Sequence, residues 1–343
     1  MSSSASIRVN GPSRTRRTVP GATIFVVHED EIGRARWRIR LVAAAGIALL
    51  AVTIAVLVFP IAVVVFAGFS LLGGSFGLGV SLLVWSAAVS ACIGIASSAG
   101  VFAWSLFRAE QRALEFVRAW PYHGSPPAPP PRMPPGAYER ADRLIQGLAI
   151  AAGVLPPSCA VVIDDAPNCL TVGRNPKTAW IVVTTGLLDL PRTELEAVLA
   201  FEIGRVTELE VSFDTVVYAC SARGFELWAA AFGEFDETSV LLAPFAVLLT
   251  PVVGGGMLLR AAALRTRARL ADGLAVRYCR NPVALAHGLR RILENPAEVA
   301  HGDPGNAHLW LEYPHTRASR WLLGTHRILP RRVKRLERVA RIG

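Results

Sequence analysis

The sequence predicts an α+β membrane protein, in which four, or at least three, transmembrane helices carry a mainly helical cytoplasmic domain with a small sheet. The 343 residues are 52% hydrophobic with a mean hydropathy of +0.40, too apolar for an ordinary soluble domain of this size. Two uncharged runs, 41–71 and 77–107, each exceed the roughly 20 residues that cross a bilayer. A later segment, 137–210, combines helical and strand patterns.

The positive charge lies at the two ends of the chain. Residues 1–40 hold eight Arg against three acids, and residues 327–343 hold seven Arg or Lys against one acid, which accounts for the whole net charge of +10. Four of these arginines, at positions 34, 36, 38 and 40, directly precede the first apolar run and should hold it on the cytoplasmic side against anionic lipid. We therefore expect the lipid bilayer as a partner and no nucleic acid.

The N-terminal arm, 1–33, is rich in Ser, Gly and Arg and is predicted to be a disordered basic segment. A first transmembrane hairpin, 34–118, follows, because five uncharged residues join its two apolar runs. Arg108, Arg112 and Arg118 place the end of this hairpin in the cytoplasm as well.

A proline-rich linker, 119–136, comes next. Proline fixes φ and lacks an N–H donor, so this linker cannot be helical. We expect it to be a stiff, extended spacer between the membrane and the domain that follows.

A soluble domain is predicted to begin with residues 137–210. Apolar residues recur at helical spacing over 137–152, and β-branched runs bounded by turn residues predict strands at 159–163 and 180–185. A further helix opens at Pro191, a residue favoured in the first helical turn. The stripe that this helix should turn to the core consists of Leu195, Val198, Leu199 and Val206.

A second transmembrane hairpin is predicted for residues 211–260. Its later half, 239–259, is uncharged and long enough to span a bilayer. Its earlier half, 211–232, either spans or lies at the interface or in the protein core, because charges in hydrocarbon must be paired or face protein. The charged residues of this half are Asp214, Arg223 and Glu226.

The domain is predicted to continue through residues 261–343, which are helical and basic. From 327 to 342, apolar residues alternate with Arg and Lys as in an amphipathic helix. This helix either lies on the domain or bilayer surface or is a solvated helix packed on its own domain.

Cysteine usage carries no disulfide or metal signal. The five cysteines are scattered, odd in number and without a C-x-x-C pair, as suits a reducing compartment. They are Cys92, Cys159, Cys169, Cys220 and Cys279.

Four blocks of the predicted domain read Val-Ile-Asp-Asp-Ala-Pro-Asn at 162–168, Gly-Arg-Asn-Pro-Lys at 173–177, Val-Val-Thr-Thr-Gly-Leu-Leu at 182–188 and Glu-Leu-Glu-Ala-Val-Leu-Ala at 194–200. These blocks resemble the HtpX-type membrane zinc metalloproteases. The resemblance covers roughly residues 137–330 by motif and the paired spans by layout. It implies a metallopeptidase-like domain in two parts, 137–210 and 261–343, at the plasma (inner) membrane, with both termini cytoplasmic.

The resemblance also places a zinc site on the helix after residue 200, where the family carries H-E-x-x-H. Two histidines one helical turn apart hold Zn²⁺, and the Glu activates the bound water. Here the two histidine positions are Phe201 and Arg205, the general-base position is Glu202, and the third ligand position is Ala268, four residues before a retained Asp272. A phenyl ring, a guanidinium and a methyl group offer no lone pair to zinc, so we expect no metal and no cofactor.

Glu202 lies on the inward stripe of its helix, and a buried carboxylate must be paired or neutralised. The expected charge partners at this degenerate site are Arg205, Asp272 and an Arg from 265–269; the alternative is a Glu202 half exposed at a cleft. His326 falls where the family has a late Thr-His, but one histidine does not make a zinc cage.

The resemblance implies that one strand lines a cleft and pairs with an extended peptide. The residues of this candidate peptide-binding strand are Trp180, Ile181, Val182, Val183 and Thr184. The alternative is an ordinary packed internal strand.

These observations predict a membrane-anchored pseudoprotease that acts as a binding, scaffold or regulatory subunit, with an extended peptide or another membrane protein as partner. The alternative is an active zinc metalloendopeptidase of membrane protein quality control that uses a non-standard site or a partner.

Overall fold

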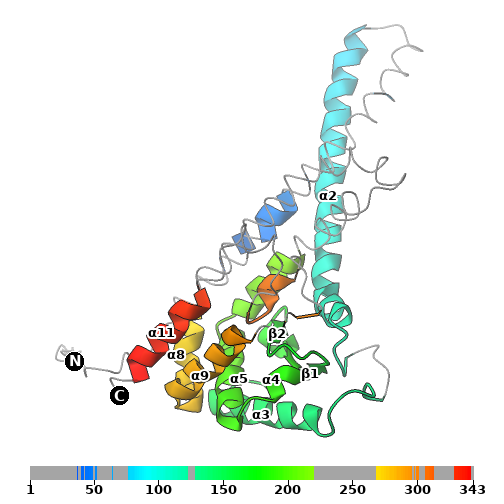
Figure 1. The fold of residues 1–343 in the computed structure, drawn as a ribbon. Coiled ribbons are helices and arrows are strands. Elements are labelled where there is room, and N and C mark those ends of the chain that lie inside the picture. Colours follow the sequence, from blue (N-terminus) through cyan, green and yellow to red (C-terminus); the bar gives the residue numbers. More distant parts are fainter. Residues whose placement is uncertain are drawn as a thin grey trace, which may run out of the picture.

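A computed structural model describes most of the domain and one long helix that leads into it (Figure 1). The described residues are 37, 40, 41, 43–48, 51, 64, 76–122, 128–219, 268–295, 297, 299, 300, 306–312 and 328–340. The helices are α2 (Phe76–Phe116), α3 (Ala137–Ala152), α4 (Thr185–Leu188), α5 (Arg192–Thr207), α8 (Ala268–Cys279), α9 (Pro282–Glu294) and α11 (Ile328–Ala340). The strands are β1 (Ser158–Val162), β2 (Cys169–Val172) and β3 (Trp180–Thr184).

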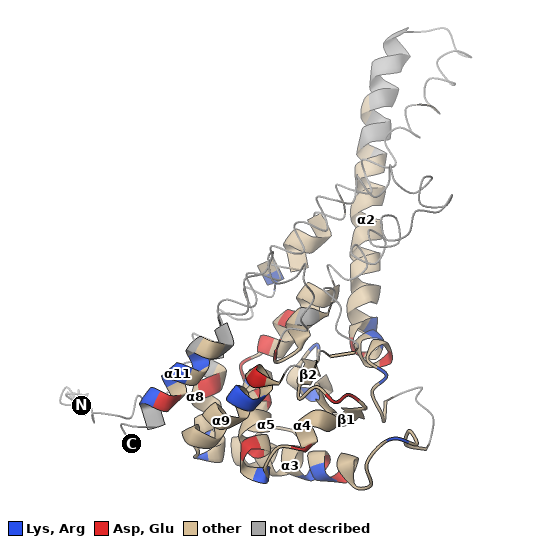
Figure 2. Cartoon of the chain, in the orientation of Figure 1, with Lys and Arg blue, Asp and Glu red and all other residues tan. Residues whose placement is uncertain are grey.

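Helix α2 stands out from the domain, and its part Ser90–Phe116 is the one candidate membrane span within the described residues (Figure 1). No charged residue is marked along its described shaft before its foot (Figure 2). Several large apolar side chains on it are exposed, as lipid contact requires: Val84, Ile93, Ile95, Val101, Trp104 and Phe107. The predicted span 77–107 lies within α2 and overlaps this candidate span, whereas 239–259 and most of 41–71 lie outside the described residues.

The sheet has the order β1-β3-β2, with β1 parallel and β2 antiparallel to β3. The predicted strands 159–163 and 180–185 are confirmed to within one residue, while β2 was not predicted. Four residues that include a cysteine and a threonine gave too short a pattern to recognise. Thr185, expected in a strand, instead begins α4, whose first turn is capped by the Thr184 hydroxyl.

Both faces of the sheet are covered. On one face, Val161, Ile181 and Val183 pack against α3 and α5. On the other face, Val162, Leu170 and Val182 pack against Ala109, Ala113, Leu114 and Val117 at the foot of α2. The last turns of α2 therefore belong to the core of the domain, so the apolar helix and the domain share one hydrophobic cluster.

Helix α5 lies at the centre of the domain, between the sheet and α8 and α9 (Figure 1). Every residue from Leu195 to Val206 except Glu196 is buried, so the predicted stripe is only part of a contact surface that runs around the whole helix. Gly204 allows α5 and α8 to pack closely, because a Cβ there would lie 3.1 Å from the Ala271 carbonyl oxygen.

The basic helix α11 packs on the domain itself, against α9. Its apolar residues Val333 and Leu336 are buried in the core, and its charged residues Arg332 and Arg335 pair with Asp272. Of the two alternatives for this segment, the structure supports a helix held by its own domain.

The proline-rich linker is not an extended spacer over its described part. The Met133 N–H donates to the Pro130 carbonyl at 2.9 Å and the Ala137 N–H to that of Pro134 at 3.1 Å, so two turns fold the chain. Met133 also packs against the domain core. The prediction of a stiff spacer was wrong here because proline favours the first positions of tight turns as much as it favours extended chain.

The beginning of the second predicted hairpin is helical over residues 210–219. Phe213, Val216 and Val217 are buried and form a cluster with Phe102 and Leu106 of α2. The charged residue of this stretch, Asp214, is buried and paired with Arg205. Residues 211–219 therefore pack against protein, and the charge of Asp214 is paired, as expected for a charged residue in an apolar segment.

Glu110 ties the foot of α2 to the β2–β3 connection. Its carboxylate accepts from the Arg174 backbone N–H at 2.8 Å, from the Arg174 guanidinium at 3.1 and 3.2 Å, and from the Thr178 hydroxyl at 2.6 Å. The guanidinium also lies 5.0 Å from the centre of the Phe107 ring.

We expect Glu110→Ala to lower the free energy of unfolding by about 1–3 kcal/mol, because it leaves four donors without their acceptor. Thermal unfolding in detergent measures the change. Glu115→Ala, at an exposed position of the same helix, is the matched control and should change stability by less than about 0.5 kcal/mol. Equal effects of the two substitutions would contradict the anchoring role.

Candidate functional site

The candidate site lies on α5, where Phe201, Glu202 and Arg205 are all buried, with exposed fractions of 3%, 0% and 4%. The α-helix brings Glu202 and Arg205, three positions apart, onto neighbouring faces. The alternative of a Glu202 half exposed at a cleft is therefore wrong.

The Glu202 carboxylate is engaged on both oxygens. Its Oε2 accepts from Arg205 Nη1 at 2.7 Å and from the Thr171 hydroxyl at 2.6 Å, and its Oε1 lies 3.6 Å from the Cys169 Sγ. Thr171 and Cys169 belong to β2, so the unpredicted strand supplies two of the three contacts. A buried carboxylate with these partners is held in one orientation.

Arg205 joins two buried carboxylates. Besides Glu202, it donates through Nη2 to Asp214 Oδ2 at 3.0 Å. Burial alone would lower the pKa of the Arg205 guanidinium, but the charges of Glu202 and Asp214 outweigh burial and raise that pKa above its ordinary value. Arg205 therefore stays protonated, and the positive charge at this site is permanent.

A second guanidinium covers Phe201. Arg332 of α11 lies with its Cζ 4.1 Å from the centre of the Phe201 ring, a cation–π contact. Arg332 Nη2 also donates to Asp272 Oδ1 at 2.7 Å, and Arg335 pairs with the other oxygen of Asp272. Asp272 was expected as a charge partner at the site, and its ionic partners in the described chain are these two arginines of α11.

Cys169 is a thiol in this environment. Burial raises the pKa of its Sγ–H well above the ordinary value, and the nearby Glu202 charge adds to that rise. The Sγ–H therefore donates to the Glu202 carboxylate as a neutral thiol.

Zinc does not fit the residues present. The two α5 positions that would face the ion carry a phenyl ring and a protonated guanidinium, and the one carboxylate between them is bound to that guanidinium. Ala268, the first residue of α8, has no donor in its side chain. Across the described residues, no group of three or more His, Cys, Asp or Glu side chains could hold a metal ion.

The candidate peptide-binding strand is the central strand of the sheet. All of Trp180–Thr184 pairs with β1, and Trp180 to Val183 pair with β2 as well. A strand with both edges hydrogen-bonded cannot accept a further strand, so the prediction of strand addition at β3 was wrong. The outer edge of β2 is also partly covered, by an antiparallel bridge from Leu170 to Trp310.

The sequence did not point to Thr171, Asp214 or Arg332 as residues of this site. Asp214 carried a usable signal, because a carboxylate in an apolar segment needs a partner. Thr171 and Arg332 carried none, since Thr171 of β2 is 31 positions from Glu202 and Arg332 of α11 is 131 positions from Phe201. His326 and residues 265–267, considered as further contributors, lie outside the described residues.

Comparison with known proteins identifies the family to which this chain belongs. Residues 137–340 match the profile of peptidase family M48, and the chain belongs to this family. It is similar to proteins named Protease HtpX homolog: that of Thermococcus sibiricus is 32% identical over 222 residues, 60% of this chain and 74% of the relative. That of Tropheryma whipplei is 33% identical over 205 residues, 56% of this chain and 70% of the relative. No solved structure shows significant similarity.

Glu202→Leu should lower the free energy of unfolding by about 3 kcal/mol, because it removes one partner of a buried ion pair and leaves the Thr171 hydroxyl without an acceptor. Arg205→Met should cost more, since Glu202 and Asp214 then share no cation. Urea or thermal unfolding measures both, and Glu139→Leu on the exposed side of α3 is the control. A loss no larger than that of the control would contradict the ion pair.

Glu312 should make the folding stability of the domain depend on pH. Its backbone N–H donates to the Asn168 side chain and its carbonyl accepts from it. Burial raises the pKa of its carboxyl from 4.5 to about 7, with the Arg332 charge opposing the rise. The folded state therefore binds a proton that the unfolded state releases between these values, so stability falls as pH rises from about 4.5 through 7.

Glu312→Gln should abolish this part of the pH dependence. The melting temperature of the unaltered protein relative to the variant should be higher at pH 5 than at pH 8, as measured by differential scanning fluorimetry. Parallel melting curves at the two pH values would show that Glu312 titrates normally.

Proposed function

We propose that this chain is a membrane-anchored, HtpX-like member of family M48 that does not hydrolyse peptides and acts as a binding, scaffold or regulatory subunit. One observation carries the proposal: the protonated Arg205 guanidinium is buried and bonded to Glu202 at the position where the family motif carries its second histidine. A fixed cation at this place repels Zn²⁺ and offers it no electron pair.

The loss of the metal removes the nucleophile of the reaction. Hydrolysis in zinc peptidases uses a water whose pKa the ion lowers to about 7. Glu202 could act as a general base only on such a water, and here its oxygens are already bound to Arg205, Thr171 and Cys169. The same residue therefore serves the stability of the domain instead of proton transfer.

Membrane attachment is supported by α2, whose apolar length suffices to cross a bilayer. The arginines before residue 41 and after residue 107 favour a cytoplasmic domain in a multi-pass protein of the plasma (inner) membrane. The partners consistent with this placement are the bilayer and another membrane protein or an extended peptide.

Metal content tests the proposal. The unaltered protein, purified in detergent without chelator and dialysed against zinc, should contain less than ~0.1 zinc per chain by mass spectrometry of the metal, because the three ligand positions are replaced. It should also leave unfolded casein intact. The matched variant combines Phe201→His, Arg205→His and Ala268→Glu and should gain zinc.

About one zinc per chain in the unaltered protein would overturn the proposal. Cleavage of casein that Glu202→Gln abolishes would favour the alternative, an active metalloendopeptidase of membrane protein quality control with a non-standard site. Cleavage that appears only after a second protein is added would favour activity that requires a partner.

A further inference from the structure

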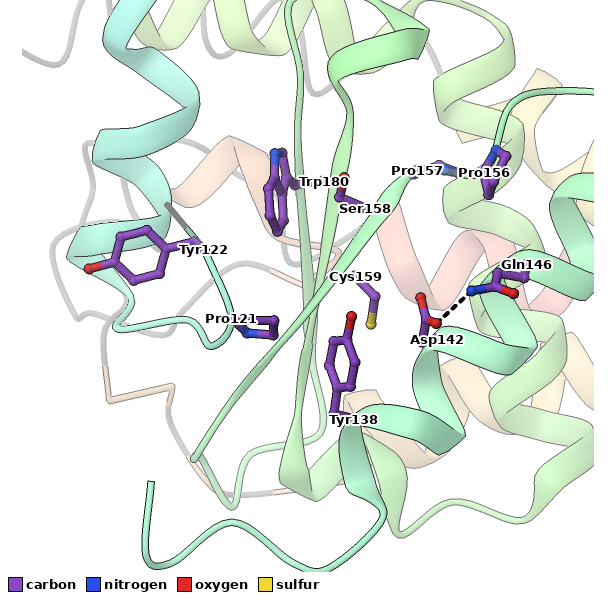
Figure 3. A pocket seen from close by; sticks show the side chains of 10 residues that line it. All are labelled: Pro121, Tyr122, Tyr138, Asp142, Gln146, Pro156, Pro157, Ser158, Cys159 and Trp180. Atoms are coloured by element: carbon purple, nitrogen blue, oxygen red, sulfur yellow. Dashed lines mark hydrogen bonds between the residues drawn. The ribbon is translucent and has the colours of Figure 1, made fainter. Parts of the chain in front are cut away.

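An open hollow of about 430 Å³ lies at the end of the sheet where β1 and β3 begin (Figure 3). None of the residues of the α5 site lines it. Rings and one carboxylate form much of its wall: Tyr122, Tyr138, Trp180, Pro121, Pro156 and Asp142. The wall therefore combines flat apolar faces with a single negative charge.

The charge in this hollow is opposite in sign to the net charge of the chain. The chain carries a net charge of +10, yet no Lys or Arg is among the described residues that line the hollow. Asp142 is only partly buried and accepts from Gln146 at 2.6 Å. Burial raises the pKa of the Tyr138 hydroxyl, and the neighbouring charge of Asp142 adds to this rise. An aromatic wall with negative potential fits a guanidinium, which binds both ring faces and carboxylates.

The same chain presents such a guanidinium on an exposed proline loop. Within the linker, Pro129, Pro131, Arg132, Pro134 and Pro135 are exposed. Arg132 is the third residue of the turn 130–133, in which the Met133 N–H donates to the Pro130 carbonyl. We call residues 128–135 the proline loop. The prolines and the hydrogen-bonded turn restrict its conformation, so little entropy is lost when it binds.

The proline loop does not occupy the hollow of its own chain, because no residue from 128 to 135 lines it. It does lie beside the hollow: the loop leads directly into α3, whose first turn carries Tyr138. A loop and a hollow side by side on one surface allow a two-fold contact, in which each copy gives its loop to the other and receives one in return.

We propose that two copies of this chain associate by inserting the Arg132 tip of each proline loop into the aromatic hollow of the partner copy, with the guanidinium beside Asp142. The guanidinium then lies against the ring of Tyr138, and the prolines pack against Pro121 and Pro156. The two contacts are identical, so each substitution acts twice in the dimer. This association is independent of zinc and of the α5 site.

The test exchanges the charges of Arg132 and Asp142 in the full chain in detergent. Light scattering measures the molar mass of the protein over a range of concentrations. The unaltered protein should be a concentration-dependent dimer. Asp142→Arg and Arg132→Glu should each weaken association by ~10-fold or more, because each places like charges together. The double variant Asp142→Arg with Arg132→Glu should recover it, because the pair is restored in the opposite sense.

Matched controls make the same charge changes at exposed positions outside the hollow: Asp165→Arg for Asp142 and Arg143→Glu for Arg132. Both should leave association unchanged, and circular dichroism should show that all variants are folded. A protein that stays monomeric at every concentration would overturn the proposal. So would a dimer that the two single substitutions leave intact, or one that the double variant fails to restore.

Discussion

The buried ion cluster of Glu202, Arg205 and Asp214 is the interaction on which the centre of this domain depends. Two carboxylates and one guanidinium, each with at most 4% of its surface exposed, are stable in the interior only together. They come from the middle of α5, its last turns and the helical stretch 210–219, and Thr171 adds a hydroxyl from β2. Removing Arg205 leaves two buried carboxylates without a cation, and removing either carboxylate leaves Arg205 with one partner instead of two, so the cluster constrains how these elements meet.

A second cluster of charged side chains, with one carboxylate and two guanidinium groups, lies between α8 and α11. Asp272 of α8 receives Arg332 and Arg335 from α11, and Arg332 also lies over the Phe201 ring of α5. In a zinc peptidase one divalent ion cross-links the helices that carry its ligands. Here hydrogen bonds of Arg205 and Glu202 join α5 to the stretch 210–219 and to β2, and Arg332 joins α11 to α8 and lies over the Phe201 ring of α5.

Packing contacts, and not a hinge, connect α2 to the domain. Ala109, Ala113, Leu114 and Val117 are buried against the sheet, and Glu110 is bound to the β2–β3 connection. A helix that ends inside a hydrophobic core cannot rotate independently of it without exposing that core. The aromatic hollow begins just after this helix, at Pro121, so a contact made there acts on the part of the domain that is fixed to α2.

The sequence by itself determined the class of fold, because hydropathy and periodicity are local properties of the chain. Neighbouring residues sufficed to predict the apolar length of α2, the helices α3 and α11 and the strands β1 and β3. Only the tertiary structure decided which groups surround Glu202, that β3 is central and closed to peptides, and that the proline linker folds into turns. These features depend on contacts between residues far apart in the chain, such as Arg332 with Phe201, and no local pattern encodes such a meeting.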